Sequence, residues 1–158
     1  MSLLTPEIEA WVGRSFEFKS DPISLSDARG FVAASGDDNP LYQLPGVGEE
    51  PLQSIPVPPM LYYAATRPFA LSEDFAEDGT VTELRPLVGT GQTMGGGVEM
   101  EWHEPLVLGD KLNGIRTLAS LNEKSGRKRD FVIAEWITEY RDSSGRLKVR
   151  ERYEQILF

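Results

Sequence analysis

The stretch Ser24–Tyr42 most strongly constrains what this chain can fold into, because it joins an amphipathic helix to an acidic turn closed by a proline. Ser24 can cap the first helical turn, and Asp27 occupies the position where a capping box usually has Glu or Gln. Gly36 stands where a helix favours a left-handed residue, and Pro40 prevents the helix from restarting. We therefore predict one short helix that delivers the side chains of the following turn to a fixed place.

The predicted helix carries a narrow apolar stripe. Its members recur at helical spacing and are Leu25, Ala28, Phe31, Val32 and Ser35. Such a stripe has to be buried against another element of the fold. We expect that a sheet wrapped round the helix would bury it.

Composition narrows the function classes. A length of 158 residues with 40% hydrophobic residues predicts a single globular domain over 1–158. A net charge of −9 argues against nucleic acid or an anionic membrane surface as a partner. The chain has no Cys and one His, which excludes disulfides, a thiolate nucleophile and a cysteine or histidine-rich metal site. We expect no metal and no bound cofactor.

The chain start lacks the basic segment and apolar run of a signal peptide. No stretch approaches the apolar length that a membrane-spanning helix needs. These observations predict a cytoplasmic protein.

The C-terminal part of the chain has the alternating pattern of β-strands. Val98–His103 alternates apolar and polar side chains, and Ser15–Lys19 does so near the chain start. Three longer strands in hairpin order are predicted over Lys111–Asn122, Asp130–Tyr140 and Lys148–Phe158. Together these make about five strands, a usual number for one antiparallel sheet.

Helices are few. Thr5 and Pro6 suit the start of a short helical turn, and a second helix is predicted over Leu61–Leu71, broken at Pro68. One principal helix before a long antiparallel sheet predicts an α+β protein. The matching architecture is a single hot-dog fold, in which a long antiparallel sheet is wrapped around one central helix.

Four short motifs occur in the order and with the gaps seen in one protein family. They are Gly36-Asp37-Asp38-Asn39-Pro40-Leu41-Tyr42, Val57-Pro58-Pro59-Met60, Met94-Gly95-Gly96-Gly97, and Glu101-Trp102-His103-Glu104-Pro105 with Gly109-Asp110. Together they resemble the MaoC-like hydratases and dehydratases, the R-specific enoyl-CoA hydratase group, and above all the N-terminal dehydratase-type domain of that family. The likeness covers the chain from about Leu4 to its end.

The resemblance implies an acid/base pair on the turn, and this chain departs from it there. The family motif carries Asp and His, which act on water and substrate. Here Asp37 keeps the Asp position, but Tyr42 stands in the His position. A proton-transfer group works best with a pKa near ambient pH, which His has and Tyr, near 10, lacks. We expect the turn of this chain to be catalytically weak or silent.

Each candidate catalytic residue has two interpretations that the sequence leaves open. Asp37 and Asn39 act in the reaction or bond the backbone of the turn, as Asx residues before Pro commonly do. Tyr42 serves as a degenerate member of the pair or as a packed aromatic. His103 replaces the missing His or is a strand residue beside the acidic Glu101.

Candidate binding residues fall into three groups. The proline-pair loop leaves Met60 and Leu61 as amide donors for a thioester oxygen, since Pro58 and Pro59 have no N–H. Gly95, Gly96 and Gly97 either approach a ligand or form a bulge entering a strand. Two basic runs offer phosphate contacts or simply solvated charge, the first being favoured: Lys124, Arg127, Lys128 and Arg129, and then Arg146, Lys148, Arg150 and Arg152.

The resemblance also implies a partner. In the family, hot-dog sheets join side by side and the acyl tunnel lies at the seam, and some members pair a half without the catalytic pair with a half that has it. The favoured hypothesis is a subunit of an enoyl-CoA hydratase or 3-hydroxyacyl dehydratase that binds an acyl-CoA or acyl-carrier thioester and shapes its pocket. A second hot-dog subunit, in a homo- or heterodimer or a dimer of dimers, would supply the Asp/His pair.

Two alternatives remain open. One is a self-sufficient homodimeric acyl-thioester enzyme that uses Asp37 with Tyr42 or His103. The other is a non-enzymatic acyl-CoA binding protein. In none of the three is a cofactor expected, because the coenzyme A thioester is the substrate or ligand itself.

Overall fold

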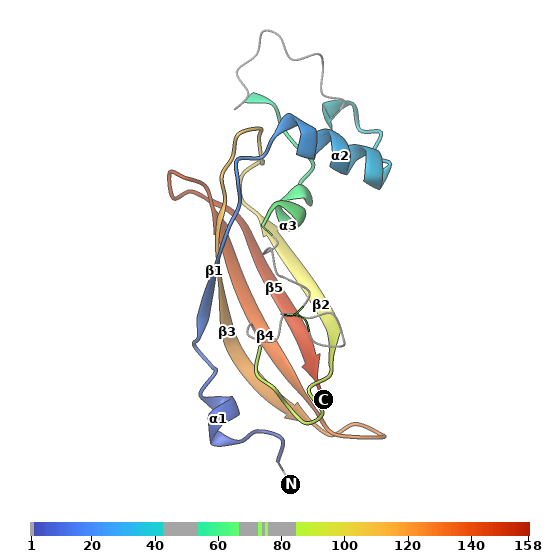
Figure 1. Ribbon diagram of the computed structural model, residues 1–158, viewed down its shortest axis with the longest axis vertical. Coiled ribbons are helices and arrows are strands. Elements are labelled where there is room, and N and C mark those ends of the chain that lie inside the picture. The colour runs from blue at the N-terminus through green and yellow to red at the C-terminus, as the bar shows by residue number, and fades with distance from the viewer. Residues whose placement is uncertain (1, 43–53, 67–72, 74, 76–84) are drawn as a thin grey trace.

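The computed structural model describes residues 2–42, 54–66, 73, 75 and 85–158. Its framework is one antiparallel sheet of five strands in the order β1-β3-β4-β5-β2 (Figure 1). The bounds of the strands are β1 Ser15–Lys19, β2 Thr93–Trp102, β3 Asn113–Lys124, β4 Phe131–Arg141 and β5 Leu147–Leu157. The predicted α+β architecture with its antiparallel meander is confirmed.

Four helical segments accompany the sheet in the described part of the chain. They are α1 Pro6–Glu9, α2 Leu25–Ser35, the 3₁₀ turn Pro40–Tyr42, and α3 Leu61–Ala65. α1 lies at one end of the sheet, and α2 and α3 lie at the other end (Figure 1). The predicted second helix is confirmed from Leu61 to Ala65, and its part beyond residue 66 falls outside the described residues.

The strands agree with the predicted ranges to within a few residues, except at the start of β2. This strand begins at Thr93 and therefore includes the glycine triple. The register between β2 and β5 shifts between Gly95 and Gly97, so the triple forms a β-bulge within the strand. The interpretation of these glycines as a bulge is confirmed.

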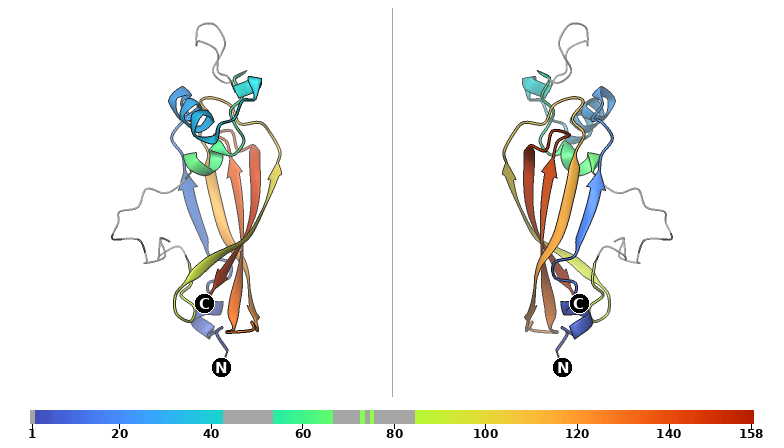
Figure 2. Two further views of the ribbon diagram at one scale, coloured as in Figure 1. Left: turned by 90° about the vertical axis from the view of Figure 1, so that its right-hand side faces the viewer. Right: turned by 90° about the vertical axis from the view of Figure 1, so that its left-hand side faces the viewer.

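The two faces of the sheet differ in burial. On β4 the alternate residues Trp136, Thr138 and Tyr140 are buried, whereas Ile137 and Glu139 between them are half-exposed. We call the first the covered face and the second the outer face. Figure 2 shows the strong twist of the sheet along its length.

The core on the covered face consists of two separate clusters. The cluster at the α2–α3 end contains Tyr62, Tyr140 and Val149, and the cluster at the α1 end contains Leu118 and Trp136. Tyr62 packs edge-on against Tyr140, with ring centroids 4.8 Å apart. Along β4, Thr138 stands between Trp136 of one cluster and Tyr140 of the other.

The local signals around α2 are confirmed. The Ser24 side chain accepts a hydrogen bond from the Asp27 N–H, and Asp27 in turn accepts from the Ser24 N–H at 3.0 Å, which completes a capping box. The hydrogen bonds from the Ser24 side chain and backbone lower the pKa of Asp27. Gly36 ends the helix in the left-handed conformation, with φ of 67°.

The position of α2 differs from the expected one, because the helix lies at the end of the sheet and is not enclosed by it (Figure 1). Within α2 only Ala28 is buried, while Leu25 and Phe31 are half-buried against the nearby core cluster. Two physical reasons are visible. Eleven helical residues span about 16 Å, less than half the length of the long strands. In addition, Tyr62 of α3 already fills the covered face where β4 meets α3.

Candidate functional site

The turn after α2 uses its polar side chains to hold its own backbone. The Asp37 carboxylate accepts a hydrogen bond from the Asn39 N–H at 2.9 Å. The Asn39 side-chain oxygen accepts from the Leu41 N–H at 3.1 Å. These are two consecutive Asx turns, the local bonding that favours Asp and Asn at such positions. One oxygen of each side chain thus accepts a backbone hydrogen bond that stabilises the turn.

Tyr42 ends the short 3₁₀ turn that follows. Its N–H donates to the Asn39 carbonyl at 2.9 Å, and its side chain is half-buried. A phenol in this place can donate a hydrogen bond, but it cannot readily take a proton from water at neutral pH. Tyr42 thus lies at the end of the turn that the Asp37 and Asn39 side chains hold.

His103 lies directly after β2 at the same end of the sheet as α3. Its N–H donates to the Lys148 carbonyl at 3.0 Å, which holds the backbone against β5. The imidazole Nε2 lies 3.6 Å from Glu101 Oε1, and the side chain is 35% exposed. His103 thus has an acidic neighbour on the surface, as the strand pattern predicted.

The proline-pair loop leads into α3. The Leu61 N–H donates to the Pro58 carbonyl at 3.0 Å, so this amide is occupied within the turn. Met60 precedes the helix and its side chain is 41% exposed. Of the two amides predicted to face a thioester oxygen, the Leu61 N–H is therefore occupied, and the Met60 N–H is the remaining candidate.

The favoured basic run lies on the hairpin between β3 and β4, where Lys124, Arg127, Lys128 and Arg129 are all exposed. The Arg129 guanidinium stacks 3.9 Å from the ring centroid of Phe158. This hairpin is at the end of the sheet opposite to α2 and α3 (Figure 1). The exposed charges are available to an anion in solution.

The second basic run is largely occupied by carboxylates of this chain. Lys148 is buried, and its Nζ lies 3.1 Å from the Pro105 carbonyl and 3.3 Å from Asp110. Arg146 pairs with Asp142 at 2.8 Å. Arg152 contacts Glu99, Glu135 and Glu154 at 2.9–3.1 Å. These three cations stabilise the sheet and its turns and are poor candidates for phosphate contacts.

The predicted site residues are thus divided between the two ends of the sheet. The α2–α3 end has Asp37, Asn39, Tyr42, Met60 and His103. The other end has the glycine bulge, next to the C-terminal residues of β5, and the basic hairpin. A single chain does not bring the two groups together.

One buried polar pair was missed by the sequence reasoning. The Tyr62 hydroxyl donates to Glu151 Oε2 at 2.6 Å, and both residues are buried. The available signal was the phase of β5. Glu151 is two residues from Val149 and two from Tyr153, so the three side chains point to the same, inward face. The basic residues of the strand, Lys148, Arg150 and Arg152, occupy the opposite phase and obscure this signal.

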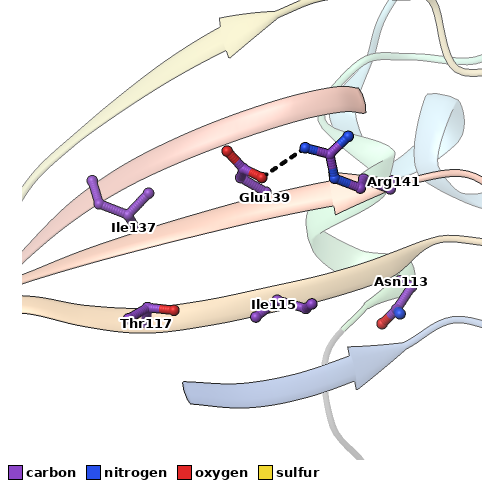
Figure 3. Close-up of a pocket in the computed structure, with 6 residues that line it drawn as sticks. All are labelled: Asn113, Ile115, Thr117, Ile137, Glu139 and Arg141. Carbon is purple, nitrogen blue, oxygen red and sulfur yellow. Dashed lines mark hydrogen bonds and ion pairs between the residues drawn. The ribbon is translucent and has the colours of Figure 1, made fainter. Parts of the chain in front are cut away.

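The outer face has a hollow of about 280 Å³ between β3 and β4. Figure 3 shows its lining, in which Ile115 and Ile137 form the apolar part and Glu139 pairs with Arg141 at 2.8 Å. It contains none of the predicted site residues. Among the residues that the structure describes, no helix is long and apolar enough to cross a membrane, and no cluster of acidic and histidine side chains suits a metal ion.

Comparison with known proteins gives a family match and a curated relative for this chain. A family model described as "FAS1-like, dehydratase domain region" matches residues 10–150. A curated protein of Thermomonospora curvata, "Probable enoyl-CoA hydratase alpha subunit", is 27% identical over 96% of this chain and 50% of its own length. The chain therefore spans about half the length of this relative.

Solved structures share the fold at low identity. The MaoC-like dehydratase from Rhodospirillum rubrum is 18% identical with a TM-score of 0.63, and the match covers 93% of this chain and 92% of that one. A chain of the ChsH1-ChsH2 complex from Mycobacterium tuberculosis is 15% identical with a TM-score of 0.65, over 96% and 87%. The predicted hot-dog fold is confirmed by these likenesses.

Proposed function

The chain belongs to the family of FAS1-like dehydratase domain regions, within the MaoC-like hot-dog group, and from this premise we propose that it is a non-catalytic subunit of an acyl-thioester hydratase or dehydratase. In this role it binds the acyl-CoA or acyl-carrier thioester and shapes the pocket. A second hot-dog subunit supplies the Asp/His pair that moves protons.

The state of the turn after α2 carries this proposal. Tyr42 occupies the place of the imidazole, and the Asp37 and Asn39 side chains are engaged with backbone N–H groups. Hydration of an enoyl thioester needs a group that can both take and return a proton near neutral pH. A turn without such a group is compatible with binding but not with efficient proton transfer.

The exposed edge of β2 supports a second hot-dog subunit as the partner. This ten-residue strand ends the sheet, and within the described ranges no other strand pairs with its free side. Val98 and Trp102 are 52% and 42% exposed. Long apolar edges favour pairing with another strand. Joining two sheets here would also bring residues from both ends of each sheet to one seam.

The partner named for similar proteins fits this proposal. The curated relative is called an alpha subunit, and the Mycobacterium structure is a complex of two differently named chains. On this basis we propose a heteromeric assembly for this chain. The exposed basic hairpin around Arg127 would contact the phosphates of coenzyme A. The coenzyme A itself could be bound by either of the two subunits that meet at the seam.

Co-expression tests the proposal. The chain is purified alone and together with a hot-dog chain from the same genome that carries an intact Gly-Asp-x-Asn-Pro-x-His turn, and water addition to crotonyl-CoA and longer enoyl-CoAs is measured. We expect binding of acyl-CoA without turnover by the chain alone, and turnover by the pair. Binding that no partner converts into turnover would favour a non-enzymatic binding protein.

A substitution on β2 tests the proposed edge. Val98→Lys places a charge at the seam and is expected to weaken the pair by about thirtyfold or more, equivalent to about 2 kcal/mol. Ile115→Lys is the matched control, because Ile115 is 48% exposed on the outer face. Equal effects of the two substitutions on the dissociation constant would place the interface elsewhere.

One observation favours a second candidate function. His103 and Glu101 lie 3.6 Å apart at the end of the free edge strand, where a homodimer would bring two copies of the pair close to the seam. A self-sufficient homodimeric hydratase would then use His103 together with Asp37. Turnover by the purified chain alone that disappears in both His103→Ala and Asp37→Ala would establish this function.

A further inference from the structure

The free edge of β2 presents backbone hydrogen-bonding groups on every second residue. The His103 N–H donates to the Lys148 carbonyl at 3.0 Å, and hydrogen-bonded pairs alternate along an antiparallel ladder. Counted back from His103 in steps of two, Glu101 and Glu99 therefore also bond β5. The N–H and C=O groups that point to the free side belong to Val98, Met100 and Trp102. An antiparallel strand of a partner can bond all of these groups.

The side chains of this edge divide into two rows. Val98, Met100 and Trp102 project to the covered face, and we call them the apolar row. Glu99 and Glu101 project to the outer face, and we call them the acidic row. The Glu99 and Glu101 side chains are 74% and 63% exposed, so both carboxylates face solvent.

The acidic row is only partly neutralised by the cations of β5. Arg152 contacts three carboxylates at 2.9–3.1 Å, those of Glu99, Glu135 and Glu154. Arg150 stands in register between Glu101 of β2 and Glu139 of β4. Each arginine thus faces two or three carboxylates, and this part of the edge keeps a net negative charge.

Two copies of the chain cannot match their apolar rows at this edge without opposing carboxylates. In an antiparallel pair about a two-fold axis, residues at equal distances from the axis stand opposite each other. With the axis at Met100, Val98 meets Trp102 of the second copy, and Glu99 meets Glu101 of the second copy twice. With the axis at Glu99, the two Glu99 carboxylates meet. Like charges directly opposite on paired strands are destabilising.

Other positions of the axis match the apolar rows less well. An axis one residue further in either direction leaves an apolar side chain opposite a glycine or a glutamate. The position at Met100 is the one that matches all three apolar side chains. The acidic row therefore acts against self-pairing in the registers that the apolar row favours.

We propose that this edge selects its partner by charge. It pairs with a strand of a different hot-dog chain that has apolar side chains on the inner face and Lys or Arg on the outer face, and it rejects a second copy of itself. The basic side chains of the partner contact Glu99 and Glu101, and its apolar side chains cover the apolar row. Such complementarity fixes partner choice and register. This inference rests on the proposed function, because it names the chemistry of the partner that the proposed subunit needs.

Sedimentation velocity of the chain alone tests the rejection of a second copy. We expect the natural chain to be monomeric at micromolar concentrations. Glu99→Lys puts a lysine opposite Glu101 of the second copy in both halves of the pair, and it should strengthen self-association by about tenfold or more. The double variant Glu99→Lys/Glu101→Lys opposes lysines and should be monomeric again. Glu17→Lys is the matched control, because Glu17 is an exposed outer-face residue of the other edge strand, β1.

Binding to the second hot-dog chain tests the preference for a basic strand. The partner is the chain from the same genome with an intact Gly-Asp-x-Asn-Pro-x-His turn. The double variant should weaken the pair by about thirtyfold or more, because two attractive contacts become repulsive. Replacing the Lys or Arg residues of the partner's edge strand by Glu should restore the affinity for the double variant, which a loss of folding would not do. Glu17→Lys should leave the dissociation constant unchanged.

The outcomes separate this inference from the proposed function. A double variant that binds the partner and supports enoyl-CoA turnover as the natural chain does would overturn charge selection and leave the proposed function intact. Self-association of the natural chain that Val98→Lys abolishes would overturn the rejection of a second copy, as would the absence of any gain from Glu99→Lys. Absence of binding between the natural chain and the partner would overturn the proposed function and this inference with it.

Discussion

The turn after α2 and the covered face of the sheet use polar side chains in opposite ways. On the turn, Asp37 and Asn39 each use one side-chain oxygen to accept a hydrogen bond from a neighbouring backbone N–H. On the covered face, Thr138 and Glu151 are buried between aromatic clusters, and the Thr138 hydroxyl has no partner in the described ranges. The two regions therefore differ in what holds their polar side chains: local backbone N–H groups on the turn, and a side chain distant in sequence on the covered face.

The two regions also differ in how deeply their side chains are buried. The turn and α2 lie at the periphery, and within α2 only Ala28 is buried, with Leu25 and Phe31 half-buried against the core. The strands under the covered face contribute fully buried large side chains to the core, among them Trp136, Leu118 and Val132. Substitutions in the two regions should consequently differ in size and in the property that they change.

The largest effect is expected for Trp136→Ala. Trp136 is fully buried, donates to Gln155 at 3.1 Å and has Arg116 stacked 4.2 Å from its ring centroid. Its removal should lower the free energy of unfolding by about 3–5 kcal/mol in urea titrations. Leu41→Ala, at a turn residue that is 65% exposed, should change it by less than about 0.5 kcal/mol. Similar effects of the two substitutions would break the comparison.

The next effect depends on pH and concerns the turn between β4 and β5. Burial disfavours the charged form of Asp142, but hydrogen bonds from Ser144 and Arg146 outweigh it and lower the pKa of Asp142 to about 2. Since the folded state has the lower pKa, this stabilisation is complete above pH of about 4 and is lost as the pH falls toward 2.

Asp142→Asn measures this contribution directly. The variant should be less stable than the natural protein by about 2 kcal/mol at neutral pH, and the difference should shrink between pH of about 4 and 2. Urea titrations of both proteins across that range provide the measurement. A difference that does not depend on pH would show that the carboxylate contributes through packing alone.

A smaller effect is expected at the start of α2. Ser24→Ala removes the acceptor of the Asp27 N–H and half of the capping box. Caps of this kind contribute about 1 kcal/mol. Because α2 is peripheral, hydrogen exchange of its amides should increase more than the exchange of β4 amides. Equal acceleration in both elements would mean that α2 is part of the central cooperative unit.

Much of the fold follows from local sequence signals. Alternation in Asp130–Tyr140 predicts β4, and Ser24, Asp27 and Gly36 predict the ends of α2 within one residue. These signals suffice because caps and strand phase depend on neighbours in sequence. The fold class could also be predicted from local signals, because a meander of long strands after one helix is compatible with few packing architectures.

The placement of α2 and the Tyr62–Glu151 pair could not be predicted in this way. Whether a narrow stripe is enclosed depends on which side chain already fills the sheet, and here Tyr62 does so from a helix of only five residues. The burial of Lys148 has the same origin, because its partners Asp110 and the Pro105 carbonyl are distant in sequence. Such contacts depend on tertiary packing.

The most direct test removes one acid/base group at a time, first from this chain and then from the partner, and compares the rates of the two variant pairs. Asp37→Ala in this chain should change the rate of enoyl-CoA hydration by less than about twofold, whereas substitution of the imidazole in the partner's turn should lower it by about 10²–10⁴-fold. A large loss from Asp37→Ala, with binding of the partner and of acyl-CoA unchanged, would contradict the proposal that this chain binds and the partner catalyses.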